Sequence, residues 1–345
     1  MTITHAPLAG AMRRGFVTAA AVLIVSLAAI RPVCANCGAE GCPLTPQGAE
    51  FTSGRFSLGM SYQYYLQDRH WDGSHEISAD QALAIEGGLG HIIELETRTK
   101  MWTLQAHVQL LPRLRVDVSL PYVDRIHRHE LAHHTAFFIP SQWRMTGLGD
   151  GAVLGSWTLP WLRTGVTGEF TVQAGVKLPT SQTQVAEVGG EAPEAAARPG
   201  SGSTDLLAGV RYRRGIGVRT LHGDHATSPV MLAASMRWNG RGTDAYRMGD
   251  EWDAFASTAY PLARHLRLTL EAIVTGHARD EAGTTGAEPH STGSVALYAA
   301  PGLLVDLGPG MAVFASQQLR LHEHTNGVQL VAPYHLSLGL RYAPH

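Results

Sequence analysis

A histidine-rich segment contains the first residues that could carry chemistry. Residues 126–134 read IHRHELAHH, and His129, Glu130 and His133 within them have the spacing HExxH. On a helix, this spacing places two imidazoles on one face as zinc ligands and makes the glutamate the general base of a metallopeptidase. The segment is short, Pro140 follows it, and no H-x-x-G-x-x-H continuation supplies a third ligand. We therefore expect neither a catalytic zinc site nor an enzyme.

Metal binding without catalysis is the alternative for the same segment. His127, His129, His133 and His134 could offer imidazoles to Zn or Cu, with Glu130 as an oxygen ligand. Histidines in a polar loop are also ordinary solvated side chains. We expect the solvated loop, without a cofactor, and keep the metal-binding protein as the alternative.

The elements that must position these side chains are strands. In 165–179, Phe170 and Val172 alternate with Glu169 and Thr171, and the same period of two recurs along the chain. Such alternation indicates strands with one apolar and one polar face. We predict about 12 strands, at 54–66, 91–110, 113–123, 148–159, 165–179, 204–214, 229–239, 250–262, 265–276, 292–305, 310–321 and 333–342. The 91–110 segment changes phase near Met101-Trp102, where we expect a bulge or a division.

The links between these strands differ at the two ends of the predicted sheet. Tight links fall at Pro112-Arg113, Pro160-Trp161, Ala263-Arg264 and Gly308-Pro309, whereas long links fall at 124–146, 179–203, 240–249, 279–291 and 322–332. This asymmetry is typical of bacterial outer-membrane barrels, and only the link 215–228 is too long for its expected side. The terminal strand 334–342 is aromatic at both ends, as in the last strand of such a barrel, although three residues follow it. We therefore predict an all-β, antiparallel, up-and-down transmembrane barrel over 54–342.

Charged residues on the polar faces distinguish this barrel from a water-soluble sandwich. A dry sandwich core would have to bury these charges, while a polar lumen accommodates them. The segment 36–53 is a candidate plug for this lumen. The predicted lumen-lining residues are Arg115, Asp117, Glu169, Lys177, Arg211, Arg267 and Glu271.

The N-terminus has the features of an export signal. Arg13-Arg14 precede the apolar run 16–30, and Val33-Cys34-Ala35 places small residues before a cleavage point. We predict a signal peptide over 1–35, with Met12 as an alternative start, and an uncleaved anchor helix as the alternative. The net charge of −2 and the 16% of charged residues give no argument for a nucleic-acid partner.

Two cysteines follow the predicted cleavage point. Cys37 and Cys42 lie four residues apart in the segment 36–53. In an oxidising compartment, such a pair most simply forms one disulfide, and a metal or haem role is the alternative. The spacing C-x4-C lacks the haem-attachment pattern, so we expect the disulfide.

Four motifs in order carry a family resemblance: LPYVDR (120–125), GLGDGAVLGSW (147–157), AGVKLPTSQT (174–183) and PGSGSTDLLAGVRY (199–212). Together they resemble the outer-membrane barrel family described as the MetA-pathway of phenol degradation family, over most of the mature chain. The chain departs from the family pattern at Pro179-Thr180-Ser181, where Pro-Thr-Gly is expected. The resemblance implies a transporter-like channel for small hydrophobic or aromatic molecules in the outer membrane of a Gram-negative bacterium. Its partners would be membrane lipid, the solute, and the export and barrel-assembly machinery.

Overall fold

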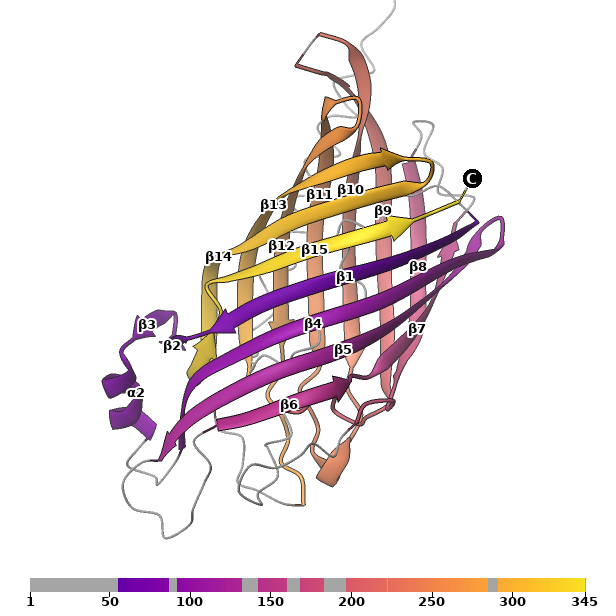
Figure 1. The fold of residues 1–345 in the computed structure, drawn as a ribbon. Helices are drawn as coiled ribbons and strands as arrows, with labels where there is room; N and C mark the ends of the chain where they lie inside the picture. Colours follow the sequence, from indigo (N-terminus) through magenta and orange to yellow (C-terminus); the bar gives the residue numbers. More distant parts are fainter. Residues whose placement is uncertain are drawn as a thin grey trace, which may run out of the picture. The chain divides into compact units, whose positions relative to one another are not determined.

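Fifteen strands form one antiparallel sheet in the computed structural model. The structure describes residues 55–86, 92–131, 142–159, 168–182, 197–221, 223–284 and 291–344. Twelve strands close into a barrel, because each pairs with the next along the chain and the last pairs with the first (Figure 1). They are β1 (Phe56–Gln67), β4 (Ile92–Leu111), β5 (Leu114–Leu131), β7 (Gly151–Thr158), β8 (Gly168–Leu178), β9 (Asp205–Arg219), β10 (His225–Trp238), β11 (Glu251–Ala263), β12 (Leu266–His277), β13 (Ser294–Gly308), β14 (Met311–Val331) and β15 (Tyr334–Tyr342). The predicted twelve-stranded up-and-down barrel is confirmed. The predicted signal peptide, Cys37 and Cys42 lie outside the described residues.

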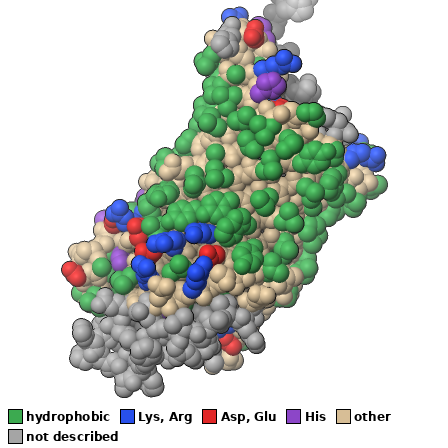
Figure 2. All heavy atoms as spheres, viewed as in Figure 1, with side chains coloured by type: hydrophobic (Ala, Val, Ile, Leu, Met, Phe, Trp, Pro, Cys, Tyr) green, Lys and Arg blue, Asp and Glu red, His purple; other side chains and the backbone are tan. Residues whose placement is uncertain are grey.

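Alternation of side chains produces the two surfaces of the wall. Large apolar side chains such as Met60 and Leu104 point outward and remain 54% and 55% exposed, while their neighbours Ser61 and Gln105 point inward. Figure 2 shows hydrophobic side chains covering the middle of this face, with charged side chains gathered toward its ends. An outward apolar band of this kind is the lipid-facing surface of a membrane barrel. Among the described residues, no helix is both long and apolar enough to cross a membrane.

An aromatic row marks one border of the apolar band. Tyr62, Trp102 and Tyr122 lie opposite one another on β1, β4 and β5. Their ring centroids are 5.2 Å and 6.1 Å apart. Rings with an apolar body and a polar edge prefer the membrane–water interface, so this row lies at the height expected for one interface.

The two ends of the barrel differ in their links, as predicted. At the end that we call the short-turn end, β4 and β5 are joined by Pro112-Arg113, and β13 and β14 by Pro309-Gly310. The link predicted at 215–228 is wrong as a long loop, since β9 and β10 continue as a hairpin that closes within 220–224. This correction removes the exception that we expected at 215–228, whereas the predicted tight link Pro160-Trp161 lies outside the described residues.

Two further corrections concern strand continuity. The 91–110 segment is one strand without a break at Met101-Trp102, and its register shifts lie at Glu94/Glu96 and Gln109/Leu111 instead. The link predicted at 322–332 is mostly strand, because β14 continues to Val331 at the opposite end, which we call the long-loop end.

At the long-loop end, small elements that we did not predict surround the wall. The strand β2 (Arg69–Gly73) pairs with β14, and β3 (His75–Ile77) pairs with β2. The helix α2 (Ala79–Glu86) begins at a capping box, in which the Gln81 N–H donates to Ser78 Oγ and the Ser78 N–H donates to Gln81 Oε1. A 3₁₀ turn, η4 (Thr243–Ala245), lies between β10 and β11.

Candidate functional site: the lumen of the barrel

One side of the lumen is lined by a polar cluster near the short-turn end. Asp117 of β5 accepts hydrogen bonds from Ser156 Oγ at 3.2 Å and from His107, and its Oδ1 lies 2.8 Å from Arg115 Nε. Three inward-facing side chains, from β4, β5 and β7, therefore share one carboxylate. The arrangement holds Arg115 and Asp117, both predicted to line the lumen, against the inner wall.

A cavity of about 150 Å³ lies beside this cluster. Three predicted lumen residues, Arg115, Glu169 and Arg211, line it together with Arg113 and Arg213, which we did not predict. The first three belong to β5, β8 and β9, and their inward-facing side chains lie at the same level along the barrel axis. Hydroxyl and amide groups and Met231 complete the lining: Gln109, Ser156, Thr158 and Thr171.

The other predicted lumen residues lie apart from this cavity. Arg267 and Glu271 sit on β12 at alternate positions that share a face with the buried residues Thr269 and Ile273. Lys177 lies at the far end of β8, toward the long-loop end. The predicted residues thus occupy several heights of the lumen.

Lys177 is the centre of a buried ion network. Its Nζ lies 2.7 Å from Asp150 Oδ2 and 2.9 Å from Asp205 Oδ2, and the three side chains are 3%, 0% and 0% exposed. The carboxylates hold further donors: the Ser181 and Gly202 N–H groups for Asp150, and Ser203 Oγ and the Gly240 N–H for Asp205. The network therefore ties strand ends of β7, β8 and β9 to the links beyond them.

The network lies where the wall changes partners. The strand β6 (Gln142–Leu148) pairs with the half of β5 nearer the long-loop end. The strand β7 pairs with the half of β5 nearer the short-turn end and also with β8. Within the described part of the chain, β6 pairs with β5 alone. Gly149 lies between the two strands in a tightly packed position, because a Cβ there would lie 2.9 Å from Pro121 Cγ and from the Pro199 carbonyl oxygen. The GLGD motif thus marks a discontinuity in the ladder of the wall.

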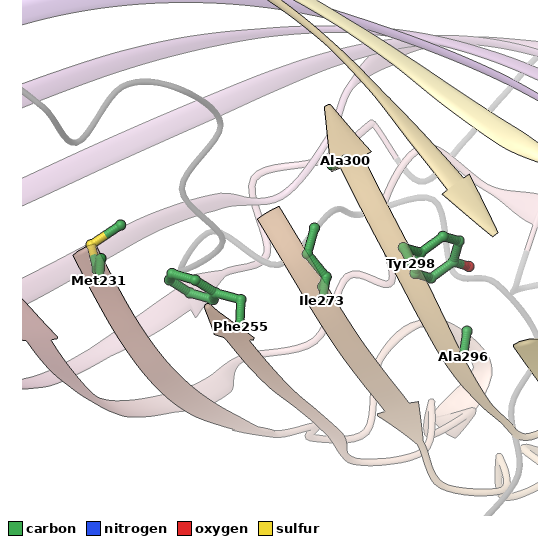
Figure 3. Close-up of a cluster of buried hydrophobic side chains, with 6 residues drawn as sticks. All are labelled: Met231, Phe255, Ile273, Ala296, Tyr298 and Ala300. Carbon is green, nitrogen blue, oxygen red and sulfur yellow. The ribbon is translucent and has the colours of Figure 1, made fainter. Parts of the chain in front are cut away.

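An apolar patch lines the opposite side of the lumen, and we did not predict it. We call it the inner apolar patch: Met231 of β10, Phe255 of β11, Ile273 of β12, and Ala296, Tyr298 and Ala300 of β13 (Figure 3). These side chains are buried, while their neighbours Leu232, Leu270 and Leu303 face outward and are exposed. Apolar residues on an inner face look in the sequence like residues on a lipid face, so these positions were not predicted to line the lumen.

The histidine segment begins inside the barrel wall rather than in an external loop, which corrects our prediction. His127 and His129 belong to β5, are buried, and lie against Trp143 of β6 at centroid distances of 5.7 Å and 4.4 Å. His127 Nδ1 lies 2.7 Å from Thr97 Oγ1. Strand alternation places both rings on the inner face. His133 and His134 lie outside the described residues, and within the described ranges no group of three ligand residues could hold a metal ion.

The chain is similar in fold to a solved outer-membrane protein. It aligns with the COG4313 outer membrane channel from Pseudomonas putida F1 with a TM-score of 0.59 and 12% identity, over 87% of this chain and 99% of that chain. Weaker likenesses include a Pseudomonas aeruginosa FadL homologue (TM-score 0.42, 9% identity, 86% of this chain and 91% of that chain) and the CymD monoaromatic hydrocarbon channel (0.36, 12%, 91% and 94%).

No family model and no curated protein matches the sequence, so the resemblance to the phenol-degradation family stays a prediction. The closed barrel, its apolar outer band and the first of these likenesses together identify the fold as that of an outer-membrane β-barrel.

Proposed function

We propose that this protein is an outer-membrane channel for small apolar or aromatic solutes in a Gram-negative bacterium. The observation that carries the proposal is the inner apolar patch. Lumens that conduct polar solutes are lined by polar side chains, whereas here six apolar side chains form one cluster on the inner faces of four adjacent strands. Burying apolar solute area against such a surface is favourable by about 25 cal/mol per Å².

The arrangement of the lumen supports a directed path for such a solute. The polar cluster of β4, β5 and β7 lines one side, and the inner apolar patch of β10 to β13 lines the other. A solute with one polar group could keep that group hydrated while its apolar part contacts the patch. The COG4313 protein of similar fold is itself described as an outer membrane channel, which agrees with transport as the function class.

An uptake experiment in intact cells tests the proposal. The chain is expressed in a Gram-negative host, and the rate of uptake of fluorescent N-phenylnaphthylamine is followed. We expect faster uptake than in the empty host and several-fold slower uptake for the double variant Phe255→Ser/Ile273→Ser, because it makes the patch polar. Phe314→Ser is the matched control, since Phe314 belongs to a separate buried cluster with Leu304 and Ala312.

The amount of folded barrel must be equal in all strains, which heat-dependent electrophoretic mobility measures. Uptake by the wild-type strain no faster than by the empty host would contradict the proposed function. An equal loss of uptake in Phe314→Ser would show that the patch has no special role.

A further inference from the structure

We propose that the Arg-lined cavity binds the anionic head of a small amphiphile, a carboxylate whose apolar tail lies on the inner apolar patch. The inference rests on the proposed channel function and names a solute class for it. The cavity belongs to the short-turn end of the lumen, which faces the periplasm in outer-membrane barrels. A carboxylate-bearing solute would therefore meet it last on the way inward.

The charge of the lining favours an anion. Four guanidinium groups and one carboxylate, that of Glu169, line the cavity. Arg115 is already paired with Asp117. With Arg115 set aside, the lining still carries three guanidinium groups and one carboxylate. This balance of charge attracts a negative group.

The positions of the arginines suit a planar, two-oxygen acceptor. Arg113 and Arg115 belong to the β4–β5 turn and the start of β5, and Arg211 and Arg213 belong to β9, with β7 and β8 between them in the wall. The hydroxyl groups of Ser156 and Thr171 lie on the strands between them. Guanidinium groups bind carboxylates with two parallel hydrogen bonds, and hydroxyl groups can complete the shell.

Met231 connects the cavity with the inner apolar patch. Its side chain lines the cavity and also belongs to the cluster with Phe255 and Ile273. The cavity of about 150 Å³ has room for a carboxylate group together with waters. An apolar tail that extends past Met231 meets the inner apolar patch.

A matched ligand pair tests this assignment. The folded protein is placed in zwitterionic lipid nanodiscs, and fluorine NMR measures the dissociation constants of 4-(4-fluorophenyl)butyrate and 4-(4-fluorophenyl)butan-1-ol. Empty nanodiscs correct for partition into lipid. The two probes share the ring and chain and differ only in the head group. We expect the acid to bind at least about tenfold more tightly than the alcohol, as one charge-assisted contact to a guanidinium suffices for this factor.

The variants distinguish the contribution of the head group to binding from that of the tail. Arg113→Gln/Arg213→Gln should remove most of the preference for the acid and leave alcohol binding unchanged. Arg219→Gln/Arg264→Gln is the control, because it removes two exposed charges at the same end without touching the lining. Phe255→Ser/Ile273→Ser should weaken the acid and the alcohol by the same factor.

Different outcomes separate the two proposals. Equal affinities for acid and alcohol in the wild type, or a preference that survives Arg113→Gln/Arg213→Gln, would overturn the anion site while alcohol binding and dye uptake still support the channel. Absence of binding of both probes, together with absence of dye uptake, would overturn both. Should the double variant not fold, sodium chloride decides with the wild type: the anion site requires that salt weaken the acid alone.

Discussion

The clearest quantitative prediction concerns the buried ion network around Lys177. Substituting Lys177 with Met keeps an unbranched side chain of similar length and removes the cation that the two aspartates share. Asp150 and Asp205 are both fully buried, and their Oδ2 atoms lie 2.7 Å and 2.9 Å from the ammonium group. The variant therefore leaves two carboxylates without their counter-charge.

The size of the effect follows from the partners that remain. Breaking a buried ion pair by removing one member costs about 3–5 kcal/mol. Asp150 keeps the Ser181 and Gly202 N–H groups at 3.1 Å and 3.2 Å, and Asp205 keeps Ser203 Oγ at 2.6 Å. These donors satisfy part of the charge, so we expect the lower end of the range. The free energy of unfolding should fall by about 3 kcal/mol, roughly a 150-fold change in the unfolding equilibrium.

Urea unfolding of the protein in phosphatidylcholine vesicles, followed by tryptophan fluorescence, measures this change. The triple variant Lys177→Met/Asp150→Asn/Asp205→Asn is the control, because it removes the charges together with their partner and should recover most of the loss. A loss below about 1 kcal/mol for Lys177→Met would refute the reasoning, since this is the range of exposed ion pairs. A triple variant as unstable as the single one would show that charge is not the cause.

Three further predictions test the wall of the barrel with the same unfolding assay. Gly175→Ala should destabilise the barrel by about 1–3 kcal/mol, because its Cβ would lie 2.2 Å from the Val153 carbonyl oxygen. Gly155→Ala is the control and should be tolerated, because the nearest atom to its Cβ lies at 3.6 Å. Equal effects of the two substitutions would contradict the close approach at Gly175. Leu104→Arg, in the outward apolar band, should cost about 2–4 kcal/mol and the inward Gln105→Arg less; the reverse order would mean that the faces are wrongly assigned. His127→Ala/His129→Ala should lower stability by removing the packing on Trp143, yet leave zinc affinity in calorimetric titration unchanged; a lost zinc site would restore the metal hypothesis.

The fold was predictable wherever the chain has a lipid face. Between Gly168 and Leu178, and between Tyr334 and Tyr342, one face meets lipid and the other the lumen, so residue types alternate with a period of two. Beyond the apolar band neither face of a strand meets lipid, and the alternation ends although the hydrogen-bonded ladder continues. This explains why the outer part of β14 and the β9–β10 hairpin were predicted as loops.

The candidate site was predictable residue by residue but not as an arrangement. A charged residue at an inward position is expected to line the lumen, which predicted Arg115, Glu169 and Arg211. That these three lie at the same level along the barrel axis depends on the strand register, which one sequence does not specify. Arg113 was assigned to a turn, where its side chain has no predictable direction. The inner apolar patch was not predicted, because the type of an apolar residue does not distinguish an inner face from a lipid face.

The histidine segment shows why a motif must be interpreted together with its element. The spacing HExxH places ligands on one face only if the backbone is a helix, with 3.6 residues per turn. Here the first half of the segment is strand, where positions two apart share a face, so His127 and His129 turn inward together. They meet Trp143, which the β5–β6 pairing brings opposite His127. The same residue types that would hold zinc on a helix therefore form an aromatic lining in a barrel, which is why our proposals for this lumen rest on the arginines and the apolar patch instead.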